Sequence, residues 1–87
     1  MTKIPGRLLA DLHPNGTVRI AFIAGDDGSE TPFTAKNLDA AEVIFMTCRL
    51  TPTRAAEIRA ELEHNKVASV QTSRDDAVVE KFRRARP

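Results

Sequence analysis

The fold is decided by residues 7–24, which read RLLADLHPNGTVRIAFIA. Apolar side chains occupy every second position in residues 7–13 and again in residues 17–24, and this period of two is typical of strands with one buried face. Residues 13–16 between them are His-Pro-Asn-Gly. Proline presets φ at the first central position of a turn, and asparagine and glycine tolerate the left-handed conformation that closes a hairpin. The stretch therefore predicts a β-hairpin.

A second group of turn-forming residues follows at 25–29, Gly-Asp-Asp-Gly-Ser. Residues 30–34 could return from it as a short third strand. Pro32 has no N–H to donate to a neighbouring strand, so this strand is expected at an edge of the sheet.

Two consecutive helices are predicted next, over residues 38–49 and 52–64. Asn37 is a good N-cap for the first, and Leu38, Ala41, Phe45 and Cys48 recur at helical spacing. Thr51 followed by Pro52 is a strong start signal for the second, because proline at the first helical position loses no hydrogen bond. We expect the second helix to end with Asn65 in the left-handed conformation.

Residues 67–72 alternate as a strand does, and residues 73–76 resemble a capping box that starts a last helix with Val78, Val79 and Phe82 on its apolar edge. The predicted order is β-β-(β)-α-α-β-α. Strands gathered at the start with hairpin connections indicate an α+β fold, in which an antiparallel sheet is covered by three helices. Eighty-seven residues are enough for one such domain, 1–87, and we expect flexible ends at 1–6 and 85–87.

The other side of the predicted hairpin is also partly apolar. Ala21 and Ile23 lie on the face opposite Phe22, and Leu9 of the first strand joins them. Either helices cover both faces of the sheet, or this second face is an exposed patch that marks a partner or self-association site. Scattered apolar residues on a surface usually have no role, so the sequence favours burial within the chain.

Composition excludes several classes of protein. Hydrophobic residues make up 41% of the chain and charged residues 29%, which excludes a disordered polyelectrolyte. The N-terminal region is too polar for a signal peptide, and no apolar run approaches the length that spans a bilayer. We therefore expect a cytoplasmic protein with no membrane association.

No residue pattern predicts catalysis, a metal or a cofactor. His13, His64 and Cys48 are the only imidazole and thiol groups, and they are far apart in the sequence. The acidic residues at 26–30 lack the alternating ligands of a calcium loop, and no phosphate-binding glycine pattern occurs. We therefore expect a non-enzymatic protein that binds no cofactor.

Nucleic-acid binding has more support, because four cations cluster near the C-terminus: Lys81, Arg83, Arg84 and Arg86. Arg54 and Arg59 of the second predicted helix could assist them. The two consecutive helices invite comparison with a helix-turn-helix, but Phe45 and Arg49 stand where that motif wants small residues, and acidic side chains oppose phosphate contact. A helical hairpin packed on the sheet fits better.

The leading hypothesis is a small protein-interaction or regulatory domain whose contact patch includes Leu9, Ala21 and Ile23. Its partner would be another protein or a second copy of the chain. The alternative is a nucleic-acid-binding accessory protein that uses the basic C-terminal helix.

Overall fold

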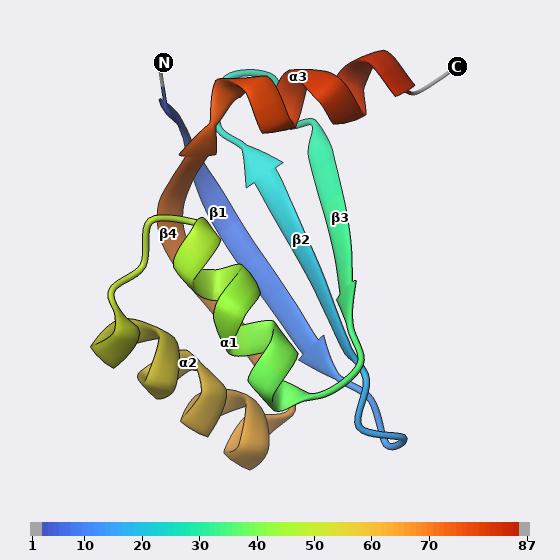
Figure 1. Cartoon of the computed structure of the whole chain (residues 1–87), viewed down its shortest axis with the longest axis vertical. Helices are drawn as coiled ribbons and strands as arrows, with labels where there is room; N and C mark the ends of the chain where they lie inside the picture. The colour runs from blue at the N-terminus through green and yellow to red at the C-terminus, as the bar shows by residue number, and fades with distance from the viewer. Residues whose placement is uncertain (1–2, 86–87) are drawn as a thin grey trace.

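The computed structural model describes residues 3–85, which form an α+β domain with a four-stranded antiparallel sheet and three helices (Figure 1). The chain passes in order through strands β1 (Lys3–Leu12), β2 (Val18–Ala24) and β3 (Glu30–Ala35), helices α1 (Leu38–Thr47) and α2 (Pro52–Asn65), strand β4 (Val67–Asp75) and helix α3 (Asp76–Ala85). This order confirms the predicted fold class, including the third strand.

The strands lie in the order β3-β2-β1-β4, so β1 and β2 are central. In the middle of the sheet Leu8 pairs with Phe22 on one side and with Val70 on the other. Strand β3, which contains Pro32, lies at an edge as expected. Strand β4 occupies the opposite edge, and the helical hairpin carries the chain across the sheet to reach it.

Both predicted helix starts are confirmed by their caps. The side chain of Asn37 accepts a hydrogen bond from the Ala40 N–H at 2.8 Å, and that of Thr51 accepts one from the Arg54 N–H at 3.1 Å. The predicted end of α2 is off by one residue. Lys66, not Asn65, adopts the left-handed conformation, with φ of 70°, and its N–H donates to the Leu62 carbonyl at 2.9 Å.

The sequence predicts a flexible end over residues 1–6, and the structure places residues 3–6 at the start of β1. Gly6 is the reason that the strand fits there. A Cβ at this position would lie 2.2 Å from the Ile23 carbonyl oxygen, so only glycine allows this approach to β2. The Gly25 N–H then donates to the Pro5 carbonyl at 2.8 Å. Of the expected C-terminal end, 86–87 lie outside the described residues.

The predicted capping box over residues 73–76 is also wrong, because β4 continues to Asp75. The strand is extended by pairing with the start of β1, where Ile4 lies opposite Arg74 and Lys3 opposite Asp75. Helix α3 begins at Asp76, directly after the end of β4. The Asp75 carboxylate accepts a hydrogen bond from the Ala77 N–H at 2.9 Å. Asp75 therefore caps the helix that Ser73 was expected to cap.

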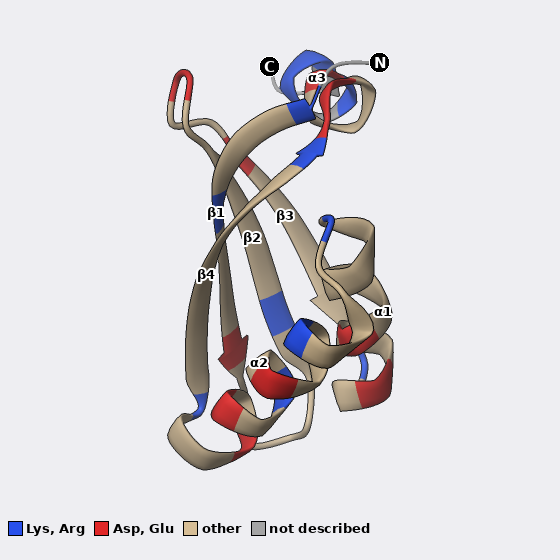
Figure 2. Cartoon of the chain, turned by 90° about the vertical axis from the view of Figure 1, so that its left-hand side faces the viewer, with Lys and Arg blue, Asp and Glu red and all other residues tan. Residues whose placement is uncertain are grey.

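The core lies between one face of the sheet and the helices. Leu8 and Phe22 of the sheet are buried together with Phe45 of α1 and Ile58 and Leu62 of α2. Figure 2 shows α1 and α2 on one side of the sheet, with α3 across its end, and the opposite side without a helix. Within the described residues, no helix is long and apolar enough to cross a membrane.

Candidate functional site: the open face of the sheet

The side of the sheet that faces away from the helices is the candidate site, and we call it the open face. Strand register arranges its residues in three rows that cross the sheet from β4 to β3. The upper row is Gln71, Arg7, Ile23 and Glu30, the middle row is Ser69, Leu9, Ala21 and Pro32, and the lower row is Val67, Asp11, Arg19 and Thr34.

The middle of this face is apolar. Leu9, Ala21 and Pro32 lie side by side in neighbouring strands, and Ile23 flanks them in the upper row. Leu9 is 39% exposed and Val67 is 54% exposed, while Ala21 and Ile23 are half-buried among their neighbours. The expectation that helices cover this face is therefore wrong, since α1 and α2 both use their apolar sides on the other face. The structure brings Leu9, Ala21 and Ile23 together on one accessible surface.

Charged side chains surround the apolar middle. Arg7 and Asp11 flank Leu9 on β1, Arg19 flanks Ala21 on β2, and Glu30 flanks Pro32 on β3. Arg7 donates a hydrogen bond to the Ser69 hydroxyl at 3.0 Å. Within residues 3–85, none of Arg7, Asp11 and Arg19 forms an ion pair. These three charges are exposed to solvent and are available to a partner.

A hollow of about 240 Å³ lies over this region. Leu9, Ala21 and Pro32 contribute to its lining, and Asp11, Arg19 and Glu30 provide its charged groups. A depression with an apolar centre and a charged border is the arrangement that protein interfaces use, with an apolar core and a polar rim.

The basic residues that the sequence singled out are not one cluster. Arg83 of α3 lies 2.7 Å from the carboxylate of Asp26, 3.0 Å from that of Asp27 and 2.6 Å from that of Glu80. Its Nε also donates to the Ser29 hydroxyl at 2.9 Å. Arg83 therefore ties α3 to the turn between β2 and β3, and its charge is neutralised within the chain.

Arg59 of α2 also forms ion pairs with carboxylates of the same chain. It lies 2.5 Å from the carboxylate of Asp39 and 3.2 Å from that of Glu42, which joins α2 to α1, and 3.3 Å from that of Glu63. These hydrogen bonds, that of Asp39 first, raise the pKa of the guanidinium above its ordinary value. Arg54 is 3.8 Å from Glu57.

Two of the remaining cations, Lys81 and Arg84, are exposed on α3, one turn apart. The last, Arg86, lies outside the described residues. The six predicted nucleic-acid contacts thus include three that already face carboxylates of the same chain.

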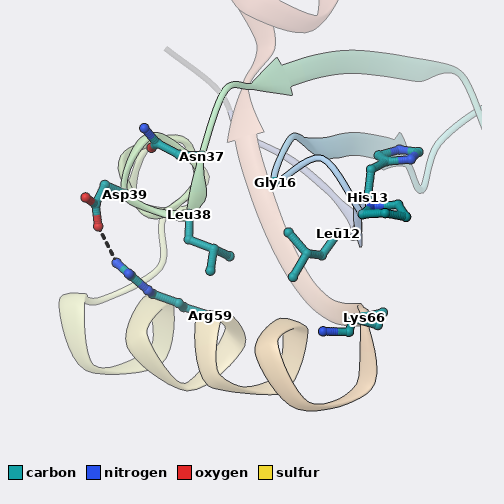
Figure 3. Close-up of a pocket in the computed structure, with 9 residues that line it drawn as sticks. Leu12, His13, Gly16, Asn37, Leu38, Asp39, Arg59 and Lys66 are labelled. Carbon is teal, nitrogen blue, oxygen red and sulfur yellow. Dashed lines mark hydrogen bonds and ion pairs between the residues drawn. The ribbon is translucent and has the colours of Figure 1, made fainter.

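A cleft that no sequence pattern predicted opens between the β1–β2 turn, the start of α1 and helix α2. It has a volume of about 600 Å³, and Leu12 and Leu38 point into it from opposite sides (Figure 3). Its polar groups already have structural roles: Asn37 caps α1, and Arg59 pairs with Asp39. The Lys66 ammonium donates to the Glu63 carbonyl at 3.3 Å. The cleft lies between two helices and a turn. Because Asn37, Asp39, Arg59 and Lys66 already bond to groups of this chain, these side chains are not free to bind a ligand.

Cys48 and Arg74 meet in the core, where α1 ends against β4. Arg74 is only 6% exposed and donates to the Cys48 sulfur at 2.8 Å and to the Thr47 hydroxyl at 3.1 Å. Its guanidinium also lies 4.4 Å from the centroid of the Phe33 ring. Burial raises the pKa of the Cys48 thiol, although the nearby cation acts in the opposite direction. The thiol is therefore protonated and structural at neutral pH, as its place in the apolar stripe indicated.

The burial of Arg74 could not be predicted, because its strand position looked like part of a helix cap. The sequence predicted a strand that contains Val67. Because side chains alternate between the two faces of a strand, and Ala68 points to the buried face, Val67 was expected on the opposite, open face. Among the described residues, no group of three histidine, cysteine or acidic side chains could hold a metal ion.

Comparison of the chain with protein-family models, with curated proteins and with solved structures finds no match.

Proposed function

We propose that this domain is a small, non-catalytic interaction module that binds protein through the open face of its sheet. The observation that carries the proposal is the uncovered apolar row in the centre of a four-stranded sheet, beside which Arg7, Asp11 and Arg19 form no ion pair within residues 3–85. We place its activity in the cytoplasm, since Cys48 is a buried free thiol and the chain has no second cysteine.

Physical chemistry favours contact at this face over other exposed apolar groups. Exposed single apolar residues are ordinary on protein surfaces, but Leu9 and Ile23 are contiguous with Ala21 and Pro32 on a rigid, hydrogen-bonded support. Removing the exposed part of a leucine or isoleucine side chain from water is worth on the order of 1 kcal/mol. Because the strands already fix these side chains, little conformational entropy is lost when a partner covers them.

Site-directed photo-crosslinking tests the proposal. A photoreactive amino acid replaces Leu9 on the open face or, as a matched control, the exposed Ala60 on α2, and each protein is irradiated in cells that express it. We expect discrete crosslinked protein bands from position 9 and none from position 60. Equal crosslinking from both positions, or none from position 9, contradicts the proposal.

The second candidate is nucleic-acid binding through α3, which the exposed side chains of Lys81 and Arg84 favour. Anisotropy of labelled DNA and RNA at rising salt concentration tests it, since phosphate contacts weaken steeply with salt. A variant with Lys81→Ser and Arg84→Ser retains the Arg83 ion pairs and should fold normally. Salt-sensitive binding that this variant loses supports the candidate, and absence of binding at low salt contradicts it.

A further inference from the structure

We infer that the partner of the open face is a second copy of this chain, related by a two-fold axis that runs along the middle row, Ser69-Leu9-Ala21-Pro32. The inference rests on the proposed function, because it names the partner of the same surface. It follows from how the charges are placed about that row.

A two-fold axis along the middle row turns the second sheet over onto the first. Each residue of the middle row then meets its own counterpart, so that Leu9 packs on the partner's Leu9 and Ala21 on the partner's Ala21. The same rotation places the upper row of one copy on the lower row of the other. Two sheets stacked in this way pack about 10 Å apart, with their strands close to aligned.

The charges become complementary in this arrangement. Arg7 and Asp11 lie on the same strand, two positions before and two positions after Leu9. Rotation about the Leu9 row therefore places Arg7 opposite the partner's Asp11, and Asp11 opposite the partner's Arg7. The contact between Arg7 and the partner's Asp11 therefore forms twice. A two-fold interface requires this, because it uses the same surface of both copies.

The contrast with the rest of the molecule supports a second copy as the partner. Arg59 and Arg83 on the helical side of the molecule each face several carboxylates of this chain. Arg7, Asp11 and Arg19 form no ion pair within residues 3–85, although Asp11 and Arg19 are opposite each other in the register. Of the charges above and below the axis, Arg7 and Asp11 are the pair of opposite sign that the rotation brings face to face.

The size of the face sets the expected strength of binding. Four strands about 4.8 Å apart and three rows about 7 Å apart cover roughly 20 Å by 20 Å. An interface of this size is at the low end of the range for specific complexes. Complexes with interfaces this small are weak and reversible, so their formation depends on protein concentration. We therefore expect monomer and dimer to exchange over micromolar to millimolar concentrations.

Charge reversal across the axis gives a sharp test by sedimentation velocity. Arg7→Glu places a carboxylate opposite the partner's Asp11, and Asp11→Arg places a guanidinium opposite the partner's Arg7. Each variant alone should show a dissociation constant raised by about tenfold or more, since the like-charge contact occurs twice. An equimolar mixture of the two variants should recover dimerisation, because every contact between unlike copies is then between opposite charges.

Arg54→Glu on α2 is the matched control, an exposed reversal of the same kind on the helical layer, and it should dimerise as the unaltered chain does. Thermal melts of all three variants establish that each is folded. A monomer at every concentration overturns the inference, and so does a dimer that neither reversal weakens or a mixture that does not recover. If the chain is monomeric but position 9 crosslinks to a different protein, the proposed function stands and only the choice of partner fails.

Discussion

Among single residues, some charged side chains of this protein form ion pairs that join its elements, and others form none within the described residues. Arg83 belongs to the first group. It lies between Glu80 of its own helix and the carboxylates of Asp26 and Asp27 in the β2–β3 turn, so a side chain that looked like part of a phosphate-binding cluster holds α3 in place. Arg7 and Asp11 are different, because neither forms an ion pair within the described residues, and Arg7 donates only to the Ser69 hydroxyl.

Asp27 gives a prediction about pH. The backbone N–H of Ser29 donates to its carboxylate at 2.8 Å, and this hydrogen bond, with help from the Ser29 side chain and Arg83, lowers the pKa of Asp27 below its ordinary value of 3.8. A lowered pKa in the folded state stabilises the fold above the ordinary pKa, and this stability is lost as the pH falls through the folded value. Asp27→Asn should therefore lower Tm slightly at neutral pH, and the difference from the unaltered chain should disappear in acid. Circular-dichroism melts over a pH series measure it, and a difference that grows in acid contradicts the assignment.

At the scale of elements, local patterns predicted what local forces decide. The hairpin followed from the alternation around Pro14 and Gly16, and the helix starts followed from the hydroxyl and amide caps at Thr51 and Asn37. The start of β1 and the end of β4 did not follow, because they stabilise each other across the whole chain, with Lys3 opposite Asp75. No local pattern contains such a pairing.

Gly6 is the residue on which this end of β1 depends. An added Cβ would lie 2.2 Å from the Ile23 carbonyl oxygen and 2.7 Å from the ring of Phe22, and the first of these is backbone that cannot rotate away. We expect Gly6→Ala to reduce the free energy of unfolding by about 1–3 kcal/mol, the usual cost of overpacking. Gly16→Ala is the comparison, since no atom lies within 4 Å of its added Cβ and only its φ of +91° opposes the change. Urea unfolding of both variants compares them, and a larger loss at Gly16 contradicts the packing argument.

In the molecule as a whole, the two faces of one sheet have different surroundings, since helices cover one face and leave the other open. Alternation in the sequence assigned Phe22 to one face and Leu9, Ala21 and Ile23 to the other, and this assignment holds in the structure. Which face the helices cover depends on where α1 and α2 pack, and residue alternation does not contain that information. The apolar stripes of the two helices are both used against the face that contains Phe22, so the other face is open.

This asymmetry predicts opposite outcomes for two otherwise similar substitutions. Phe22 is fully buried. Phe22→Asp should unfold the protein, because the free-energy cost of burying an unpaired carboxylate exceeds the total free energy of unfolding of a small domain. Leu9→Asp should leave the fold intact and lower the free energy of unfolding by about 1 kcal/mol or less, since the new carboxylate stays in water. Far-ultraviolet circular dichroism with thermal melting distinguishes them. An unfolded Leu9→Asp variant would mean that the open face is part of the core.

A methyl NMR dilution series on the unaltered chain tests self-association through the open face directly. If the open face joins two copies, the methyl resonances of Leu9, Ala21 and Ile23 shift together as the protein is diluted, while that of Val43, exposed on α1, stays constant. Resonances that do not change on dilution, or changes confined to Val43 and Met46 on the helical layer, would contradict self-association through the open face.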